Sequence, residues 1–136
     1  MLTLEQLDRH FQKYDPFTRR LGIRLVSVGD GCSAAEMPLD DRHRNGVGIA
    51  GGAAIFSLID FTFAAASNAD GKYRATAQSS VSFLRPGTKG PLHCEAHCVR
   101  SGRQLGTYEV RVTDADGNLL AVALLTSSET GRNIPL

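Results

Sequence analysis

Hydrophobic residues recur at two different periods along this chain, and the period changes about halfway. Near the start, Leu7 and Phe11 lie at helical spacing behind Thr3, which forms a capping-box pattern with Gln6. This spacing predicts an amphipathic helix over residues 4–14, ended by the Asp-Pro pair that follows it. Two strands joined by a Gly-Asp-Gly turn are expected next, at residues 21–28 and 32–39.

The longest apolar stretch predicts a buried central helix. Residues 51–68 are rich in Ala, Leu, Ile and Phe, and this length suits a helix better than a strand. The Asn-Ala-Asp-Gly sequence at 68–71 supplies the stop signal at its end. A polar, positively charged loop over residues 40–48 precedes the helix.

The second half changes to period-2 alternation, which is typical of strands. Tyr108, Val110 and Val112 alternate with polar neighbours, and turn sequences recur at short intervals. Four strands, which we expect to form an antiparallel meander, are predicted at residues 74–84, 90–100, 104–113 and 119–128. Strands segregated beside a long helix indicate the α+β class, in one domain over residues 1–136 whose core spans about 21–130.

Composition and charge exclude several function classes. The formal net charge is +1 and no basic, aromatic-interleaved patch is present, so nucleic-acid binding is not expected. No apolar run reaches the roughly 20 residues that span a bilayer, and the N-terminal sequence lacks the apolar core of a signal peptide. Three cysteines cannot all pair within one chain, which favours a reducing compartment, and a cytoplasmic location is expected.

Three motif-like sequences have simpler explanations than the sites they imitate. Residues 46–51 spell G-x-G-x-x-G, but the polar residues before them do not form the buried strand that a dinucleotide site requires. The His-Cys-Glu-Ala-His-Cys sequence at 93–98 would put histidines and cysteines on opposite faces of a strand, so we expect inward-packed cysteines and no metal site. The Asp-Ala-Asp-Gly sequence at 114–117 lacks the later ligands of a calcium loop and predicts a hairpin turn.

A lone carboxylate within the apolar stretch is the first candidate for chemistry. Asp60 is flanked by Ile, Leu and Phe, where a charged side chain requires a partner or a function. It either faces solvent or caps a backbone group, or it lies at a cleft where desolvation raises its pKa toward that of a general base. At the start of the stretch, Gly51 and Gly52 leave first-turn N–H groups accessible, which is the geometry of an oxyanion hole, and Asn45 can add an amide.

The spacing of these groups bears on the number of chains in the site. Gly52 and Asp60 are eight residues apart, which is about 12 Å along a helix. One substrate carbonyl cannot touch both groups in the same chain. If both act on one reaction centre, they come from two chains related by a two-fold axis, and at least a homodimer is expected.

Together these residues resemble the hotdog-fold acyl-CoA thioesterases, specifically the phenylacetate-degradation (PaaI-like) branch. That family shows an Asn, a short loop, His-Gly-Gly and then an apolar helix that carries an Asp. The corresponding residues here are Asn45, Gly51, Gly52 and Asp60. The resemblance also covers the strand at 76–84 with the Arg-Pro-Gly after it, and it spans nearly the whole chain after residue 17.

The resemblance implies a long helix wrapped by a strongly curved antiparallel sheet, in dimers that commonly pair into tetramers. Asp60 would be the general base or nucleophile toward a thioester carbonyl, and the Gly52 N–H of a partner chain would stabilise the oxyanion. Asn45 would hold the water or the carbonyl, and Thr76 matches a hydroxyl that assists the water. Coenzyme A is part of the substrate, and no separate cofactor or metal is expected. The residues expected to contact the substrate or its coenzyme A moiety are Gly51, Arg85, Arg100, Arg103 and Phe61.

One position departs from the family pattern. Gly51 stands where the family usually has His, and the second Gly of the motif is replaced by Ala53. The backbone donor survives because it needs no side chain, whereas the imidazole that would orient the carbonyl is absent.

Three functions follow from this pattern. The predicted function is hydrolysis of an acyl- or aryl-CoA thioester by Asp60-assisted attack of water, in a site shared between two subunits. The alternative is a non-catalytic acyl-CoA-binding hotdog protein, which the missing His favours. A hotdog hydratase or dehydratase ranks last, because His43 and Asp41 are not spaced convincingly for that chemistry.

Overall fold

The computed structural model describes all 136 residues, which form one six-stranded sheet and three α-helices. The elements in chain order are α1 (Leu4–Tyr14), α2 (Pro16–Arg20), β1 (Arg24–Gly29), β2 (Cys32–Met37), the 3-10 helix η1 (Asp41–His43), α3 (Gly52–Ser67), β3 (Lys72–Phe83), β4 (Leu92–Ser101), β5 (Leu105–Thr113) and β6 (Leu119–Asn133). All neighbouring strands are antiparallel, in the order β1-β2-β4-β5-β6-β3.

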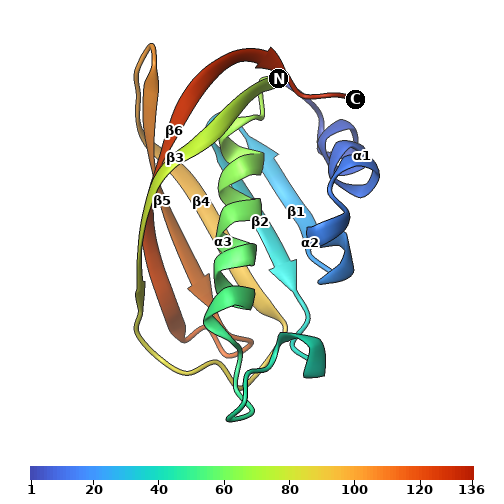
Figure 1. Ribbon diagram of the computed structural model, residues 1–136, viewed down its shortest axis with the longest axis vertical. Helices are drawn as coiled ribbons and strands as arrows, with labels where there is room; N and C mark the ends of the chain where they lie inside the picture. Colours follow the sequence, from blue (N-terminus) through green and yellow to red (C-terminus); the bar gives the residue numbers. More distant parts are fainter.

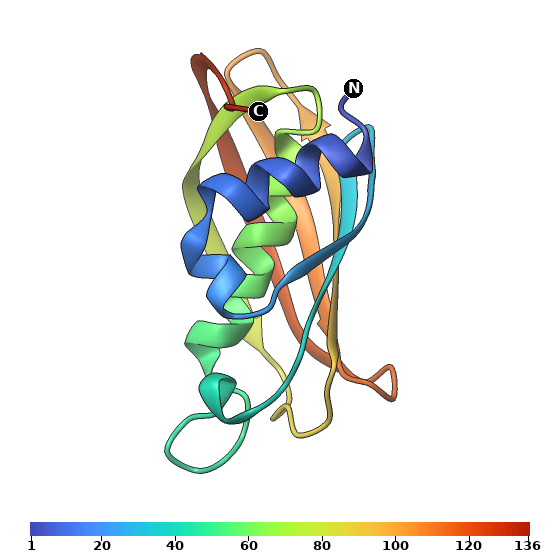
Figure 2. The ribbon, with the colours of Figure 1, turned by 90° about the vertical axis from the view of Figure 1, so that its right-hand side faces the viewer.

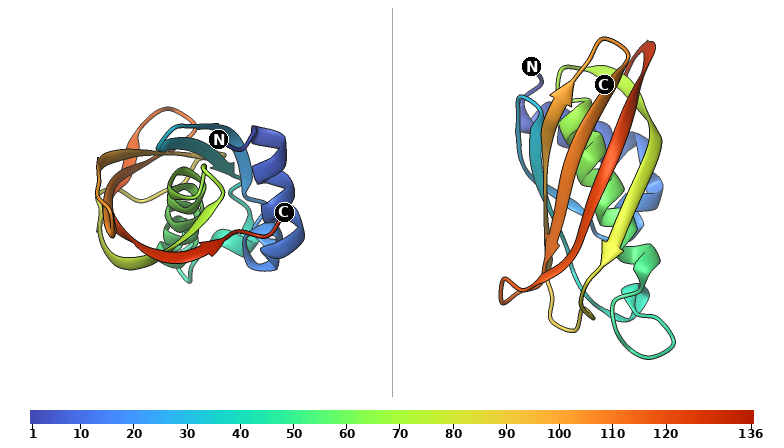
Figure 3. Two further views of the ribbon diagram at one scale, coloured as in Figure 1. Left: turned by 90° about the horizontal axis from the view of Figure 1, so that it is seen from above. Right: turned by 90° about the vertical axis from the view of Figure 1, so that its left-hand side faces the viewer.

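The sheet curves around α3, which lies along its concave face (Figure 1). Seen along the helix axis, strands surround α3 on most sides, and α1 and α2 cover the side that the sheet leaves open (Figures 2 and 3). Apolar side chains of α3, such as Leu58 and Ile59, are fully buried against inward-facing sheet residues such as Val110 and Leu125. The predicted long helix wrapped by a curved antiparallel sheet is therefore confirmed.

The N-terminal helix begins as predicted, but the Asp-Pro pair after it does more than end it. The side chains of Thr3 and Gln6 both complete the capping box of α1. Asp15 then serves as the N-cap of a second short helix, α2, and accepts a hydrogen bond from the Thr18 N–H at 3.2 Å. Pro16 occupies the first helical position, where its missing N–H costs nothing. An Asp-Pro pair is thus a start signal for α2 that the sequence prediction did not use.

The predicted four-strand meander is wrong for its first strand. β4, β5 and β6 are consecutive neighbours, but β3 pairs with β6 at the far edge of the sheet and does not pair with β4. The connection over residues 84–91 therefore crosses the end of the sheet instead of forming a hairpin (Figure 1). Alternation of apolar residues predicts that a strand exists, whereas its neighbours depend on contacts distant in sequence.

Two of the three motif-like sequences are seen to adopt the simpler structures. Cys94 is fully buried and Cys98 packs against the core, while His97 on the same strand is exposed. Within the 114–117 sequence, Gly117 has a positive φ of 84° and its N–H donates to the Asp114 carbonyl, as in a hairpin turn. No helix of the protein is both long and apolar enough to cross a bilayer.

Candidate active site

The first turn of α3 carries unpaired backbone donors. Gly51 is the N-cap residue, with an extended backbone (φ −69°, ψ 146°) and no side-chain cap. The first helical bond runs from the Ile55 N–H to the Gly51 carbonyl at 3.0 Å, so the N–H groups of Gly52, Ala53 and Ala54 find no acceptor in the chain. These donors lie at the positive end of the helix dipole, where a developing oxyanion is stabilised.

The loop before α3 is held by two polar side chains. The Nδ1 atom of buried His43 accepts from the Asp40 N–H at 3.1 Å, and its Nε2–H donates to the Leu21 carbonyl at 2.7 Å. Both ring nitrogens are engaged, so His43 fixes the loop and has none free for acid–base chemistry. The Oδ1 atom of exposed Asn45 accepts from two N–H groups of its own loop, at 3.1 and 3.4 Å. The Asn45 NH₂ group is therefore the part of this side chain available to a ligand.

A pocket of about 360 Å³ opens beside the start of α3. Asn45 and Gly52 line one side, and Arg85 with its neighbours in the β3–β4 connection lines the other. The Ala50 N–H donates to the Gly87 carbonyl at 2.9 Å, which ties the two walls together. The pocket is mainly apolar with a few convergent polar groups, as expected of a ligand site.

Asp60 lies eight residues beyond Gly52 on α3, and its side chain is half-buried. The Thr76 hydroxyl donates to its Oδ1 atom at 3.2 Å, and no basic side chain pairs with it. Burial raises the pKa of Asp60 above its ordinary value; the Thr76 hydrogen bond opposes this, and the Asp15 carboxylate adds a smaller increase. The Asp60 carboxylate thus has the environment expected of a general base rather than of a surface charge.

A second cavity, of about 520 Å³, lies further along the same face of α3. Ala64 and Asn68, which follow Asp60 at intervals of four residues, line this cavity between α1 and the C-terminal segment. His10 closes one side, because its Nδ1–H donates to the Pro135 carbonyl at 2.6 Å. Asp60 therefore lies between a pocket at the start of its helix and a cavity toward the end.

The structure brings most of the predicted site residues into two clusters. One cluster is the Asp60–Thr76 pair. The other lies at the start of α3, where Asn45, Gly52 and Arg85 line the pocket and Gly51 is the adjoining N-cap residue. Gly52 and Asp60 both lie on α3, eight residues apart, so about 12 Å of helix separates the two clusters within one chain.

Three predicted contact residues lie outside these clusters. Arg100 and Arg103 are near the β4–β5 turn, which lies at the opposite end of the molecule from the start of α3 (Figure 1). Phe61 is buried in the core, with its ring centroid 4.4 Å from that of Phe11, and it lines neither cavity.

Sequence reasoning missed several residues that line the two cavities. Phe83 closes the pocket beside Gly52, and Tyr73 with Ile134 lines the larger cavity. These walls depend on the long pairing of β3 with β6 and on the return of the C-terminus over Gly71, whose carbonyl accepts from the Ile134 N–H. An aromatic residue at the end of a predicted strand was a signal that could have identified Phe83 as a pocket residue. Nothing in the sequence indicated that Ile134 lines a cavity.

Comparisons with known proteins agree with this geometry. The sequence profile of the Thioesterase superfamily matches residues 48–121, which include α3 and most of the sheet. A putative esterase of Archaeoglobus fulgidus is 29% identical over 97% of this chain and 86% of its own length. The acyl-coenzyme A thioesterase PaaI of Escherichia coli is also 29% identical, over 88% of this chain and 86% of its own length.

Solved structures show the same fold. The structure of the E. coli PaaI protein superposes with a TM-score of 0.91 at 27% identity, covering 97% of this chain and 96% of that one. A Streptococcus mutans protein bound to acetyl CoA has a TM-score of 0.77 at 30% identity, covering 82% of this chain and 90% of that one. The chain therefore belongs to the thioesterase superfamily and has the hotdog fold.

Proposed function

We propose that this protein hydrolyses the thioester bond of an acyl- or aryl-coenzyme A, with Asp60 assisting the attack of water. The observation that carries the proposal is the half-buried Asp60 carboxylate, which has a hydroxyl partner, no cationic partner and a pKa raised by burial. A carboxylate of this kind is more basic than one at the surface and is suited to accept a proton from water. The names of the relatives, esterase and acyl-coenzyme A thioesterase, support the same reaction class.

The proposed reaction balances without a cofactor or metal. A water oxygen attacks the thioester carbonyl carbon while Asp60 takes a proton from that water. The carbonyl oxygen becomes an oxyanion, which accepts hydrogen bonds from the free N–H of Gly52 and from the Asn45 NH₂ group. Breakage of the carbon–sulfur bond then releases the acid, and the thiolate takes the proton back from Asp60.

The proposed site is shared between two copies of the chain. Within one chain the Gly52 donor and the Asp60 carboxylate lie about 12 Å apart, too far for one carbonyl. β3 supports a paired arrangement, because this 12-residue edge strand is exposed along most of its length and a long free edge is a template for another strand. We therefore expect at least a homodimer; its pairing into a tetramer and the cytoplasmic location stay predictions.

The acyl group would extend from Asp60 into the cavity of about 520 Å³ on the same chain. Ala64 and Asn68 continue the face of α3 that carries Asp60, so the cavity begins one helical turn beyond the carboxylate. Its volume falls within the usual range of about 300–1,000 Å³ for small-molecule sites.

The test is hydrolysis of a panel of acyl-CoA thioesters by wild type and Asp60→Asn. Asparagine has the same shape and still accepts from Thr76, but it cannot take a proton. Turnover should fall by at least about 100-fold, the scale of a lost acid–base group, while the secondary structure and oligomeric state stay unchanged. Equal hydrolysis by both proteins would remove Asp60 from the mechanism.

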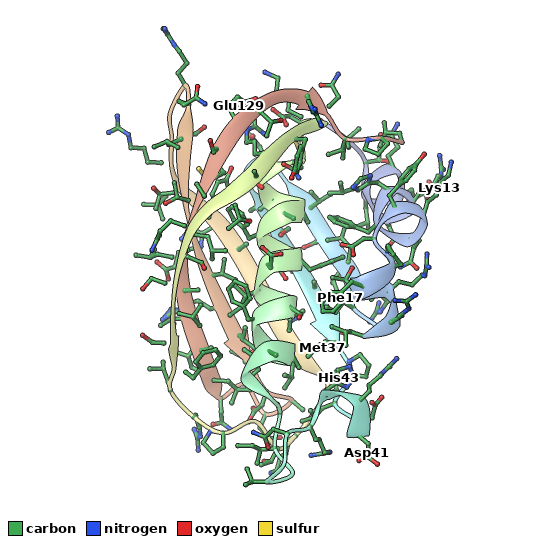
Figure 4. All side chains as sticks on the ribbon, in the orientation of Figure 1. Lys13, Phe17, Met37, Asp41, His43 and Glu129 are labelled. Carbon is green, nitrogen blue, oxygen red and sulfur yellow. The ribbon has the colours of Figure 1, made fainter.

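A binding protein without catalysis is the second candidate. The observation that favours it is Gly51, which leaves the start of α3 without the side chain that the family motif usually supplies. Tight binding of acyl-CoA with no hydrolysis by the wild type would establish this candidate. A hydratase or dehydratase has less support, because both ring nitrogens of His43 are engaged and the Asp41 side chain is fully exposed at the lower edge of the molecule (Figure 4).

A further inference from the structure

The backbone around Arg85 is fixed at both sides of the residue. The Leu84 N–H donates to the Leu120 carbonyl at 2.8 Å, and the Gly87 carbonyl accepts from the Ala50 N–H at 2.9 Å. Arg85, which lines the pocket beside Gly52, therefore has a backbone position fixed by hydrogen bonds. Its long side chain is exposed, however, and a free Arg side chain samples many rotamers, whose entropy is lost when the guanidinium binds a ligand.

Asn118, in the β5–β6 hairpin, restricts this side chain. Its Oδ1 atom accepts a hydrogen bond from the Arg85 guanidinium at 3.1 Å, and its Nδ2 group donates to Asp114 Oδ2 at 3.0 Å. Because a carboxylate only accepts hydrogen bonds, Asp114 requires the NH₂ side of the Asn118 amide. The amide cannot flip without losing both bonds, so its carbonyl stays directed at Arg85.

Asp114 is itself held by the hairpin. Its Oδ1 atom accepts from the backbone N–H groups of Asp116 and Asn118, both at 2.9 Å. The hydrogen bond from the Asn118 side chain contributes most to lowering the pKa of Asp114, and these two backbone bonds add to it. The pKa is therefore held below its usual value, and the carboxylate stays charged. Direct hydrogen bonds therefore connect Asp114 to Asn118 and Asn118 to Arg85.

A separate set of contacts fastens the hairpin to the β3–β4 connection. The Ala115 N–H donates to the Lys89 carbonyl at 3.1 Å, and Lys89 Nζ pairs with Asp116 at 2.9 Å. The Asn118–Arg85 bond is therefore not needed to dock the two loops. Its distinctive effect is on the direction of the guanidinium.

We propose that Asn118, oriented by Asp114, is a positioning residue that holds the Arg85 guanidinium at the mouth of the pocket to bind the phosphates of a nucleotide thioester. The inference rests on the proposed function, in which the thioester carbonyl of a coenzyme A ester lies at Gly52, on the wall of this pocket. Arg85 keeps four of its five N–H donors for phosphate oxygens when one is given to Asn118, and a guanidinium held in place loses less entropy on binding.

The test compares ligands with and without phosphates. Calorimetry measures the Kd of coenzyme A and of pantetheine, which has the same thiol arm but no nucleotide, for wild type and for Arg85→Ala, Asn118→Ala and Asp116→Asn. Arg85→Ala should raise the Kd of coenzyme A by about tenfold, the scale of one charge-assisted contact. Asn118→Ala should raise it by about threefold to tenfold, the scale of one ordered side chain. Neither variant should change the Kd of pantetheine.

Asp116→Asn is the matched control, because it breaks the loop-fastening pair and leaves Asn118 and Arg85 intact. Asp116→Asn should not change the Kd of coenzyme A. Equal weakening by all three variants, or loss of pantetheine binding as well, would show a structural role and overturn the proposal. Unchanged binding of coenzyme A by Asn118→Ala would also overturn it. Binding needs no turnover, so an inactive wild type that still shows this pattern would contradict the proposed hydrolysis and retain the positioning role.

Discussion

The Asp60 carboxylate is better solvated in the unfolded chain than in the folded protein. Burial raises its pKa above 3.8, so the folded state holds the proton more tightly than the unfolded state does. At a pH above the folded pKa, the ionised group therefore lowers stability. This loss is relieved as the pH falls through the folded pKa toward 3.8, where both states become protonated.

Asp60→Asn should consequently be more stable than wild type at pH 7 while being less active. The gain in the free energy of unfolding should shrink as the pH is lowered through the Asp60 pKa. Urea denaturation at a series of pH values measures it. Asp41→Asn is the control, because the Asp41 side chain is fully exposed and its change should stay within about 0.5 kcal/mol. A variant less stable than wild type at pH 7 would contradict the desolvated carboxylate.

The Thr76 hydroxyl has the opposite effect to burial on the pKa of Asp60. Its hydrogen bond favours the ionised form of Asp60 and lowers the pKa. Thr76→Val should therefore move the acidic limb of the pH–kcat/KM profile to higher pH, whereas Thr76→Ser, which keeps the hydroxyl, should leave it in place. Coincident limbs for all three proteins would mean that Asp60 does not govern the profile.

Gly51 allows a direct test of the missing imidazole. A Cβ built at this position makes only ordinary contacts, with the His43 carbonyl at 3.5 Å, the Asn45 Cβ at 3.7 Å and the Asn45 backbone nitrogen at 3.9 Å, and the φ of −69° suits any residue. Gly51→His should fold normally and raise kcat by about tenfold, the scale of one hydrogen bond made in the transition state. Gly51→Ala, which adds the Cβ without the ring, should show no such gain.

At the scale of elements, Arg74 joins the end of α3 to two strands. Its guanidinium pairs with Asp70 at 2.8 Å and Glu129 at 2.9 Å, and also donates to the Ser67 carbonyl. The Arg74 side chain is only 19% exposed. These contacts hold the upper end of the molecule, where Glu129 lies far from His43 (Figure 4).

Arg74→Met keeps the aliphatic stem and removes the charged bonds. The free energy of unfolding should fall by about 1.5–3 kcal/mol, the scale of hydrogen bonds to charged groups. Arg24→Met is the comparison, because Arg24 is 67% exposed in its pair with Glu36 and such surface pairs contribute about 0–1 kcal/mol. Chemical denaturation measures the stability lost by each variant. Equal losses would contradict the expectation that the less exposed arginine contributes more.

Local patterns predicted the elements better than their pairing. The capping box at Thr3 and the apolar run of α3 are properties of adjacent residues, and both were predicted correctly. The neighbours of β3 were not, because its pairing with β6 joins residues such as Val81 and Ala123 that are far apart in sequence. The site divides in the same way: its α3 residues were predicted, and the cavity walls from β3 and the C-terminus were missed.

For the whole molecule, the proposed two-chain site can be tested by mixing subunits. Gly52→Pro removes one N–H donor without disturbing the helix, because proline suits the first helical position and Gly51 before it is extended. Asp60→Asn removes the proposed base. Each variant alone should be nearly inactive. Mixed and allowed to exchange, they should recover about a quarter of wild-type activity, since half of the dimers are mixed and one of two sites in each is intact.

The same mixture separates the shared site from a site within one chain. If a single chain held both groups, every chain in the mixture would carry a defect and no activity would return. Mixing Asp60→Asn with Thr76→Val provides the control, because these two residues lie in the same cluster and no mixed dimer contains an intact wild-type site. Activity in this mixture should therefore not exceed that of the Thr76→Val chains it contains.

The placement of Gly52 and Asp60 two turns apart on α3 also makes activity a measure of protein concentration. On the proposed arrangement a solitary chain is inert even when fully folded. A newly synthesised copy gains activity only on meeting another, and dilution below the dissociation constant of the dimer switches it off again. In this range the rate of hydrolysis rises with the square of the amount of protein, so small changes in expression have amplified effects on thioester levels.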